Sequence, residues 1–412
     1  MAMRRMLVAI GVAITAAATG CTGAQWSAPG GSDRPPQARV TSPADAATGV
    51  PTAAEIVFTA AGAKDVAVTL VDAAGNRVEG ALRADGSSWL PAAQLEYSTK
   101  YTGMVSATFS NGARAEAKST FTTMAEPANL VDVHSYIGDD QVVGVGAPIV
   151  ITFGLDVPAD RRADVQRRLF VRSDPPQEGI WHWFGGSEVH YRPRERWRPG
   201  TKLDVRIGTG GLAWGVKDWY GRHDLTIRAS VGPALSIEVD NGTKKMTVTR
   251  DGKVPRTIPV SLGKPSSPSS SGNLLVMERK TPNLFNSATY GVPVNSPDGY
   301  QTVVEWTMRL TWSGEFIHAA PWSVASQGRR NVSHGCVNIS TAAAKWLYGI
   351  THVGDPVTVR GTERRVKPGD GWTDWELPWS EYVKGSALPY IPAGSGATAT
   401  DAPVPAPSTS RN

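Results

Sequence analysis

Short apolar runs separated by turn signals dominate the first third of the chain. Within residues 38–125, apolar and polar positions alternate, and Asp-Gly and Asn-Gly dipeptides stand between the runs. A period of two is typical of strands with one buried face. The clearest runs are residues 56–58, 66–71, 103–106 and 119–122. We therefore predict an immunoglobulin-like β-sandwich over residues 38–125.

A second stretch repeats this pattern. Its strand-like runs are residues 149–153, 189–191 and 202–207. Residues 197–201 begin with an aromatic residue and stand just before a late run, as residues 97–101 do in the first stretch. We predict a second immunoglobulin-like module over residues 126–232. Five tryptophans lie in it: Trp181, Trp183, Trp197, Trp214 and Trp219. We expect them to pack in the core or between modules, with stacking on sugars as the alternative.

Residues 233–361 predict a third, β-rich domain with short helices. Residues 235–239 and 245–249 form a meander, and residues 263–272 read as a loop. Three prolines make residues 280–300 a hairpin-like flap instead of a central strand. The other expected elements are strands 302–311, 315–319 and 355–359, and a helix over 342–348 begun by Ser340 or Thr341 and ended by Gly349. The Trp-rich residues 362–392 should pack back on the preceding modules, and residues 393–412 should be disordered.

Composition agrees with a mainly β fold. The 412 residues include 43 Gly and 30 Pro, which suit a turn-rich protein. The formal net charge is +5, and there is no block of Lys and Arg that would favour a nucleic-acid partner.

The amino end predicts export. Arg4 and Arg5 precede an apolar run over residues 6–18, and Cys21 follows a stretch that resembles a bacterial lipobox. We expect residues 1–20 to be a signal peptide, Cys21 to be lipidated and residues 21–37 to be a linker. The protein would then be held on the cell membrane by its lipid, facing the cell wall, with a net charge of +3. Ordinary signal-peptidase cleavage is the alternative.

Cys336 is the strongest candidate for chemistry. It is one of two cysteines, and Ser333, His334 and Gly335 precede it. Fourteen residues separate His318 from Ser333. A thiol near a histidine can act as a nucleophile, a buried cysteine can simply pack, and a His-x-Cys pair can bind zinc. Zinc needs about four ligands, and the sequence has no Cys-x-x-Cys, so we expect no metal and no cofactor.

The stretch from His318 to Asn338 resembles the signature of the L,D-transpeptidases: His, a spacer of family length, then Ser-His-Gly-Cys-hydrophobic-Asn. Flanking residues 296–300, 316–323 and 325–328 are also similar to that family, as is the two-module layout. The resemblance implies a transpeptidase that forms 3→3 cross-links between peptidoglycan stem peptides and releases the terminal D-alanine of the donor. It also implies inhibition by β-lactams, carbapenems above all.

The resemblance further implies roles for individual residues. Cys336 would be the nucleophile and His318 the base, oriented by the carbonyl of Ala319. The amides of Gly335 and Cys336, with Tyr300, are candidates for the oxyanion site. The remaining assignments are Ser333 and His334 for the geometry of the catalytic site, and Phe285, Tyr290, Tyr300, Trp322 and Asn338 for substrate binding, with Asn338 alternatively structural.

Two other functions stay open at this point. A cysteine carboxypeptidase or endopeptidase trimming the same stems would differ only in using water instead of an amine to resolve the acyl-enzyme. A wall-binding lipoprotein with an inert catalytic domain is the second alternative, and the intact motif argues against it.

Overall fold

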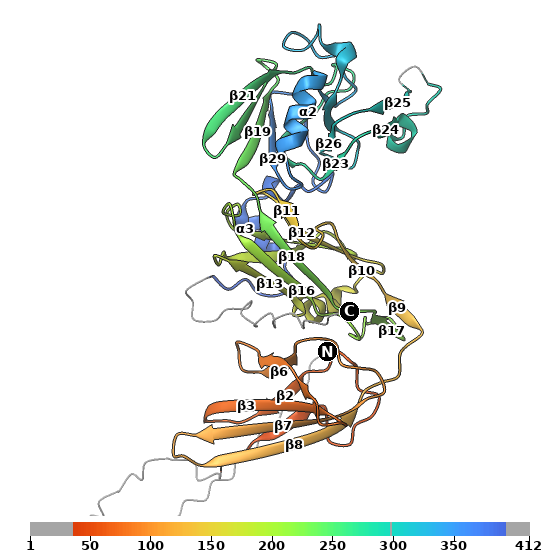
Figure 1. Ribbon diagram of the computed structural model, residues 1–412. Coiled ribbons are helices and arrows are strands. Elements are labelled where there is room, and N and C mark those ends of the chain that lie inside the picture. The colour runs from red at the N-terminus through yellow and green to blue at the C-terminus, as the bar shows by residue number, and fades with distance from the viewer. Residues whose placement is uncertain (1–35, 297–298, 393–412) are drawn as a thin grey trace, which may run out of the picture. The chain divides into compact units, whose positions relative to one another are not determined.

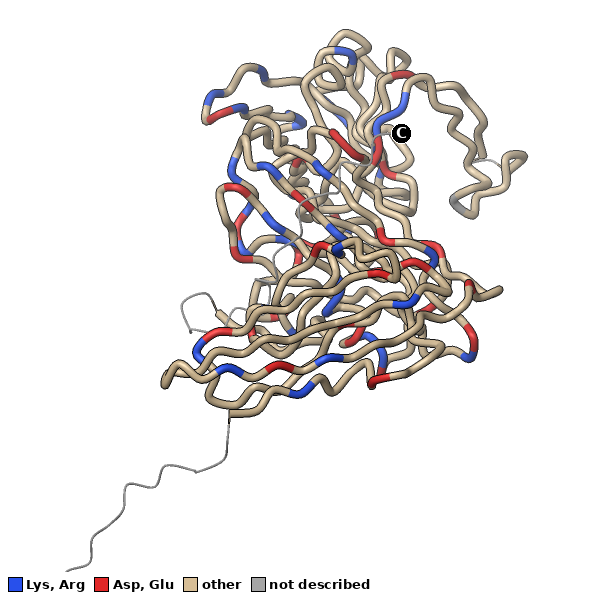
Figure 2. Tube along the Cα trace, turned by 60° about the horizontal axis from the view of Figure 1, so that its bottom comes forward, with Lys and Arg blue, Asp and Glu red and all other residues tan. Residues whose placement is uncertain are grey.

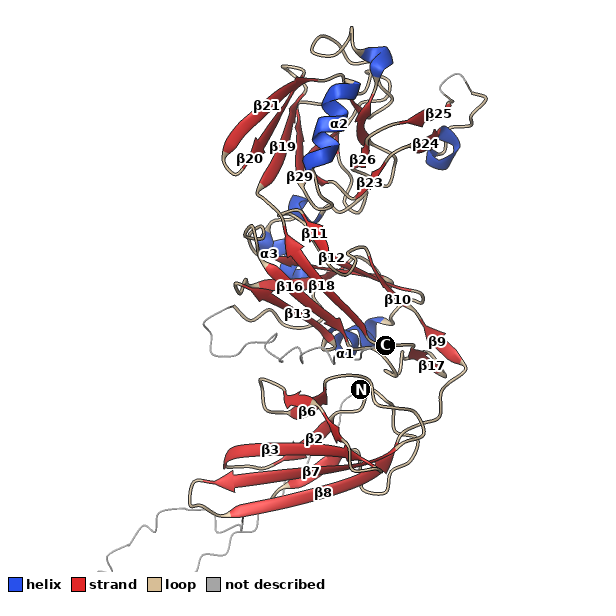
Figure 3. Cartoon of the chain, viewed as in Figure 1, coloured by secondary structure: helices blue, strands red, loops and turns tan. Residues whose placement is uncertain are grey.

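The computed structural model describes residues 36–296 and 299–392. At Tyr290 it describes the backbone but not the side chain. The predicted signal peptide, Cys21, Pro297, Asp298 and the predicted C-terminal tail lie outside the described residues. The fold is mainly β, as predicted (Figure 3). Helices are short: α1 (Arg162–Gln166), α2 (Thr341–Ile350) and α3 (Trp379–Tyr382), with 3-10 turns η1 (Ala159–Arg161), η2 (Ser287–Tyr290), η3 (Pro321–Ser323), η4 (Asp374–Glu376) and η5 (Val383–Gly385). Within the described ranges, no helix has the length and apolarity needed to cross a bilayer.

The first module is a sandwich of two four-stranded sheets (Figure 1). One has the order β1 (Arg39–Ser42), β2 (Ile56–Thr59), β6 (Ser88–Pro91), β5 (Gly80–Leu82). The other has the order β4 (Arg77–Val78), β3 (Ala63–Asp72), β7 (Lys100–Phe109), β8 (Arg114–Thr122). Alternate side chains of β7 are buried, so Val105 packs with Ile56 and Leu70 between the sheets. The predicted Asn-Gly turn joins β7 to β8, and Gly112 adopts the left-handed φ of +80° there.

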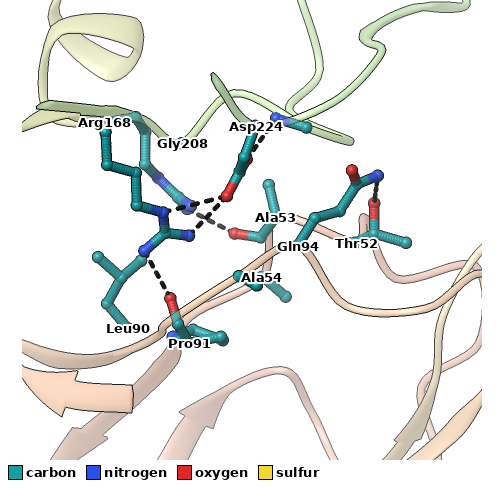
Figure 4. Close-up of a pocket in the computed structure, with 12 residues that line it drawn as sticks. Thr52, Ala53, Ala54, Leu90, Pro91, Gln94, Arg168, Gly208 and Asp224 are labelled. Carbon is teal, nitrogen blue, oxygen red and sulfur yellow. Dashed lines mark hydrogen bonds and ion pairs between the residues drawn. The ribbon is translucent and has the colours of Figure 1, made fainter. Parts of the chain in front are cut away.

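Charged side chains join the first module to the second and line a small pocket (Figure 4). Arg168 donates to Ala53 O at 2.6 Å and forms an ion pair with Glu55 at 2.9 Å. Arg206 pairs with Asp224 at 2.7 Å in the same region. These partners satisfy the arginines that line the pocket.

The second module also has two four-stranded sheets. Their orders are β10 (Val133–Ser135), β12 (Ile149–Phe153), β15 (Glu188–Pro193), β14 (Gly179–Trp183), and β11 (Gln141–Val143), β18 (Leu225–Val231), β16 (Lys202–Ile207), β13 (Leu169–Asp174). A parallel pair, β9 (Asn129–Val131) and β17 (Trp219–Gly221), lies beside them. Four of the five tryptophans are buried in this core, as expected, and each indole N–H donates a hydrogen bond: Trp181, Trp183, Trp197 and Trp214. Trp219 is half-buried against the same core.

The third domain places a six-stranded sheet against a four-stranded one. The larger has the order β21 (Lys253–Pro259), β20 (Lys245–Arg250), β19 (Leu235–Asp240), β29 (Pro356–Arg360), β22 (Ser270–Leu275), β30 (Arg364–Arg365). The smaller has the order β23 (Glu278–Lys280), β26 (Thr307–Arg309), β27 (Phe316–Ala319), β28 (Val337–Ile339). Ile237, Ile317 and Leu347 share one core, which both sheets and α2 line. The flap is the hairpin of β24 (Asn283–Asn286) and β25 (Gln301–Val304).

The prediction of a single strand over residues 302–311 is wrong, because the chain forms two separate strands there, β25 and β26. β25 pairs in the flap, whereas β26 pairs in the four-stranded sheet. The chain breaks at Trp306, whose φ is +54° and whose N–H donates to Thr281 Oγ1 at 3.0 Å. A bulky residue in the left-handed region is uncommon, so periodicity gave no sign of this break.

Two other boundaries differ from the prediction. Ser340 caps α2 as expected, and its Oγ accepts from Ala343 N at 3.3 Å. Gly349 does not end the helix, which continues to Ile350, because Gly349 is not among the positive-φ glycines. The loop predicted over 263–272 is shorter, because β22 begins at Ser270 and pairs there with Arg364.

The C-terminal segment (residues 362–392) packs on the second module, as expected. His190 Nδ1 lies 3.0 Å from Asp374 Oδ2, and Tyr382 OH donates to Asp374 Oδ1 at 2.9 Å. Arg192 donates to Leu377 O at 3.0 Å and lies over three aromatic rings, those of Trp375, Trp379 and Tyr382. The segment is thus held by buried polar contacts and not only by its tryptophans.

Charges of both signs are interspersed along the trace. Figure 2 shows Lys and Arg near Asp and Glu over much of the described chain, whereas the described residues of 281–304 carry no charged side chain. Such mixing leaves no continuous basic stripe among the described residues.

Candidate active site

Two parallel strands bring the candidate residues to one face. β27 pairs with β28 so that His318 is opposite Asn338. Side chains alternate along a strand, so Phe316 and His318 share a face with Cys336 and Asn338. The opposite face, with Ile317 and Ile339 on it, packs into the domain core. The hydrophobic pattern of these two strands therefore directs the polar residues away from the core.

The loop of residues 333–336 is held by its own serine and by a neighbouring one. Ser333 Oγ donates to Cys336 O at 2.6 Å and accepts from Gly335 N at 3.1 Å. Ser269 Oγ donates to Gly335 O at 2.6 Å. Gly335 has φ +129°, a left-handed conformation that favours glycine. The Gly335 amide thus donates to Ser333 in this arrangement, and its place in an oxyanion site stays a prediction.

Cys336 is the one cysteine among the described residues and is buried, with 8% of its surface exposed. Its thiol donates to Gly314 O at 3.7 Å. Burial, with a smaller contribution from the charge of Glu315, raises the pKa of the thiol to about 12 against the lowering effect of the Phe316 N–H. The resting thiol is therefore neutral.

His318 is a buried, neutral imidazole. Burial lowers its pKa to about 4, against the opposing effects of Ala319 and Asn338. Its Nδ1 lies 2.9 Å from Ala319 O, as predicted. A carbonyl can only accept, so Nδ1 carries the proton and Nε2 is the basic nitrogen. The thiol donates to Gly314, so Cys336 and His318 form a neutral pair in which the proton has not moved.

The flap places aromatic rings over this pair. Phe285 is buried, and its ring centroid lies 4.6 Å from that of Phe316 and 5.3 Å from that of His318. Tyr300 packs against the cluster that contains Phe285 and Cys336. Tyr290 lies in η2, and its side chain is outside the described residues.

Of the other predicted residues, two are exposed near the Cys336 and His318 side chains and one is buried. His334 is exposed, accepts from Lys264 Nζ at 3.1 Å and lies 5.7 Å from the Tyr300 ring. Trp322 is 63% exposed, with its ring 5.9 Å from that of His318. Asn338 is buried and donates to Ser323 Oγ at 3.3 Å. Its Oδ1 raises the pKa of His318, yet no described donor reaches Oδ1 with hydrogen-bond geometry.

Sequence reasoning missed the contribution of Glu315, Arg364 and Ser270. Glu315 is buried directly before β27 and accepts from both Ser270 and Arg364. A charged residue directly before the apolar pair Phe316 and Ile317 was the available signal for Glu315. Among the described residues, no group of three or more His, Cys, Asp or Glu side chains is arranged to hold a metal ion.

Comparisons with known proteins give matches over most of the chain. Residues 47–213 match the model of a bacterial Ig domain, and residues 235–359 match that of the L,D-transpeptidase catalytic domain. L,D-transpeptidase 2 of Mycobacterium tuberculosis (strain CDC 1551) is 39% identical over 344 residues, which are 83% of each chain. L,D-transpeptidase 5 of M. tuberculosis (strain H37Rv) is 34% identical over 88% of this chain and 80% of the relative. A solved structure of LD transpeptidase LdtMt1 in complex with imipenem is 37% identical, with TM-score 0.48, and covers 57% of this chain and 100% of the other.

Proposed function

This chain belongs to the L,D-transpeptidase family, and we propose from that premise that it joins peptidoglycan stem peptides through 3→3 cross-links. One observation carries the proposal. The thiol of Cys336 lies under the flap, on the same strand face as an imidazole whose tautomer Ala319 O fixes with Nε2 basic. A nucleophile with an oriented base is the minimum for acyl transfer.

Acylation begins with the neutral pair. The Cys336 side chain turns from Gly314 O toward His318, and the thiol proton passes to Nε2. The sulfur attacks the carbonyl carbon of the third stem residue, a diamino acid at its L-centre. The carbon–nitrogen bond to the terminal D-alanine breaks, and its nitrogen takes the proton from His318. A thioester on Cys336 remains, and D-alanine leaves.

Transfer reverses these steps with a new amine. The side-chain amine of a second stem attacks the thioester carbonyl, and His318 accepts the proton that the amine loses. The carbon–sulfur bond breaks, and the thiol is restored. Phe285 and Tyr300 cover Cys336 from the flap side, which supports an amine as the acceptor because a covered thioester meets less water.

Product analysis tests this function. The full chain is incubated with a purified tetrapeptide donor, with and without an acceptor stem, and the products are identified by mass spectrometry. We expect a 3→3 dimer and free D-alanine from the wild type, and neither from Cys336→Ala. A small residue replaces a small one there, so the fold should persist. A wild type that only trims the donor would establish a carboxypeptidase instead.

We also propose that a carbapenem acylates Cys336. The strained ring offers a carbonyl to the sulfur, and the ring nitrogen leaves the carbon but stays tethered. The adduct therefore adds the whole mass of the drug. Intact-protein mass spectrometry with imipenem should show this adduct on the wild type and not on Cys336→Ala.

Export and lipid attachment remain proposals supported by the sequence. Arg4, Arg5, the apolar residues 6–18 and Cys21 are the supporting features. A lipid anchor contributes about 0.8 kcal/mol per buried CH₂, so Cys21→Ala should move the protein from the membrane fraction to the soluble or uncleaved fraction. Equal fractionation of the two proteins would refute lipid attachment.

A further inference from the structure

An ion pair between the buried Glu315 and the partly exposed Arg364 lies against the residue that precedes Cys336. A Cβ added to Gly335 would meet Glu315 Cγ at 3.5 Å and Arg364 Nη2 at 3.9 Å. Glu315 is 5% exposed and directly precedes β27. Arg364 comes from β30, where it is aligned with Ser270 of β22. Three segments distant in sequence therefore meet beneath Gly335.

Ser270 links the two charges. Its N–H donates to Glu315 Oε2 at 2.9 Å, and its hydroxyl donates to Oε1 at 2.7 Å. The same hydroxyl oxygen accepts from Arg364 Nε at 3.1 Å, while Arg364 Nη2 donates to Glu315 Oε1. Arginine is a donor only, so the serine proton is directed at Glu315. Every polar contact to the carboxyl group is a donor, which is the environment of an ionised carboxylate.

This carboxylate acts on the thiol. Burial is the largest cause that raises the pKa of the Cys336 thiol, and the charge of Glu315 is the other cause that raises it. Burial also raises the pKa of Glu315 itself, and Ser270 and Arg364 oppose that effect. The other titratable or charged groups around the site are His318 on β27, His334 in the loop of residues 333–336, Lys264 beside His334, Tyr300 in the flap and Arg309 over the Phe316 ring.

We propose that Arg364 is a positioning residue for the nucleophile: it neutralises Glu315 next to Cys336 and holds Glu315 and Ser270 against Gly335. Glu315 joins β22 to β27 through Ser270, and a buried carboxylate needs a cation. Without Arg364, a thiolate on Cys336 would form beside an uncompensated negative charge. The inference rests on the proposed role of Cys336 as nucleophile.

The test is the reactivity of Cys336 toward iodoacetamide, a small uncharged probe that makes no use of the substrate site. The thiolate forms the sulfur–carbon bond as the carbon–iodine bond breaks and iodide leaves. The rate is followed from about pH 7 to about pH 10 by mass spectrometry of the peptide that contains Cys336, in the full chain. Each unit of thiol pKa changes the thiolate fraction about tenfold below the pKa.

The variants should act in opposite directions. Arg364→Gln should slow labelling about tenfold, a shift of about one pKa unit. Glu315→Gln should speed it, and the double variant should return close to the wild-type rate, because both charges are gone. Arg364→Lys keeps the charge and should label at close to the wild-type rate. Arg365→Gln is the matched control, since Arg365 is adjacent, exposed and paired with Glu376 at 3.2 Å, and it should change nothing.

A purely structural role gives a different pattern. Slower labelling in Glu315→Gln as well as Arg364→Gln, or a double variant slower than either, would overturn the inference. So would slowing by Arg364→Lys equal to that of Arg364→Gln. A wild type whose Cys336 forms no acyl-enzyme would instead remove the proposed function.

Discussion

Asp374→Asn should loosen the C-terminal segment in a pH-dependent way. Asp374 is fully buried and accepts from His190 Nδ1 and from Tyr382 OH. His190 is 1% exposed, and its Nε2 lies 2.9 Å from Glu188 Oε1. Burial opposes protonation of His190, but the charge and hydrogen bond of Asp374, with help from Glu188, raise its pKa to about 9. The pair is therefore an imidazolium with a carboxylate at neutral pH.

The magnitude follows from that shift. A rise from 6.5 to about 9 corresponds to roughly 3 kcal/mol of stability. A group with a raised folded pKa gives this stability fully below its unfolded pKa, about pH 6.5, and loses it as the pH rises through about 9. Truncating a buried pair costs about 3–5 kcal/mol, which agrees. The variant should thus be about 3 kcal/mol less stable in this region at about pH 6, and within about 0.5 kcal/mol of the wild type at about pH 9.

Hydrogen exchange of peptides from residues 374–385 measures this directly. The opening free energy is compared between wild type and Asp374→Asn at both pH values, after correction for the intrinsic exchange rate. Glu381→Gln is the control, because its pair with Lys384 is exposed and should contribute less than about 1 kcal/mol. An equal deficit at both pH values would refute the charge argument, and a deficit below about 1 kcal/mol at pH 6 would refute the ion pair itself.

Three further outcomes are expected. Phe285→Ala should remove about 3 kcal/mol of flap packing and raise the ratio of hydrolysed to cross-linked product, measured by chromatography with mass detection. An unchanged ratio would mean that other residues shield the thioester from water. Ser340→Ala should lower the free energy of unfolding by about 1 kcal/mol in urea titrations, with Ser340→Asp close to wild type; equal losses in both would argue against the cap. Acylation by imipenem should be nearly independent of pH between about pH 6 and about pH 10, because the reactive forms, a neutral thiol and a neutral imidazole, both persist between a His318 pKa lowered to about 4 and a Cys336 pKa raised to about 12; a rate that rises steeply with pH, or a maximum near neutrality, would contradict the neutral pair.

The local patterns in the sequence predicted most strands and the helix cap. Alternation over residues 103–106 identified β7 because one face of that strand is buried. Ser340 before an Ala-rich run identified the start of α2 because the cap acts within one turn. The position of His318 on β27 followed from the strand predicted over residues 315–319, whereas the short strand β28 after Cys336 was not predicted.

Contacts between distant segments could not be predicted in this way. Glu315 and Arg364 are 49 residues apart, and His190 and Asp374 are 184 residues apart. No periodicity relates such positions, because sheet order and chain return bring them together. The break at Trp306 was hidden for another reason: a positive φ in a bulky residue depends on its surroundings, here a hydrogen bond to Thr281.

The return of residues 362–392 to the second module gives the catalytic domain two attachments. The chain enters the domain just before β19 and leaves it after β29, and these two strands are neighbours in the sheet. Beyond β29, the chain is fastened to His190 and Arg192 of the second module. A protease that cuts the connection near residue 233 would therefore leave two fragments that still migrate together under native conditions and separate only in denaturant.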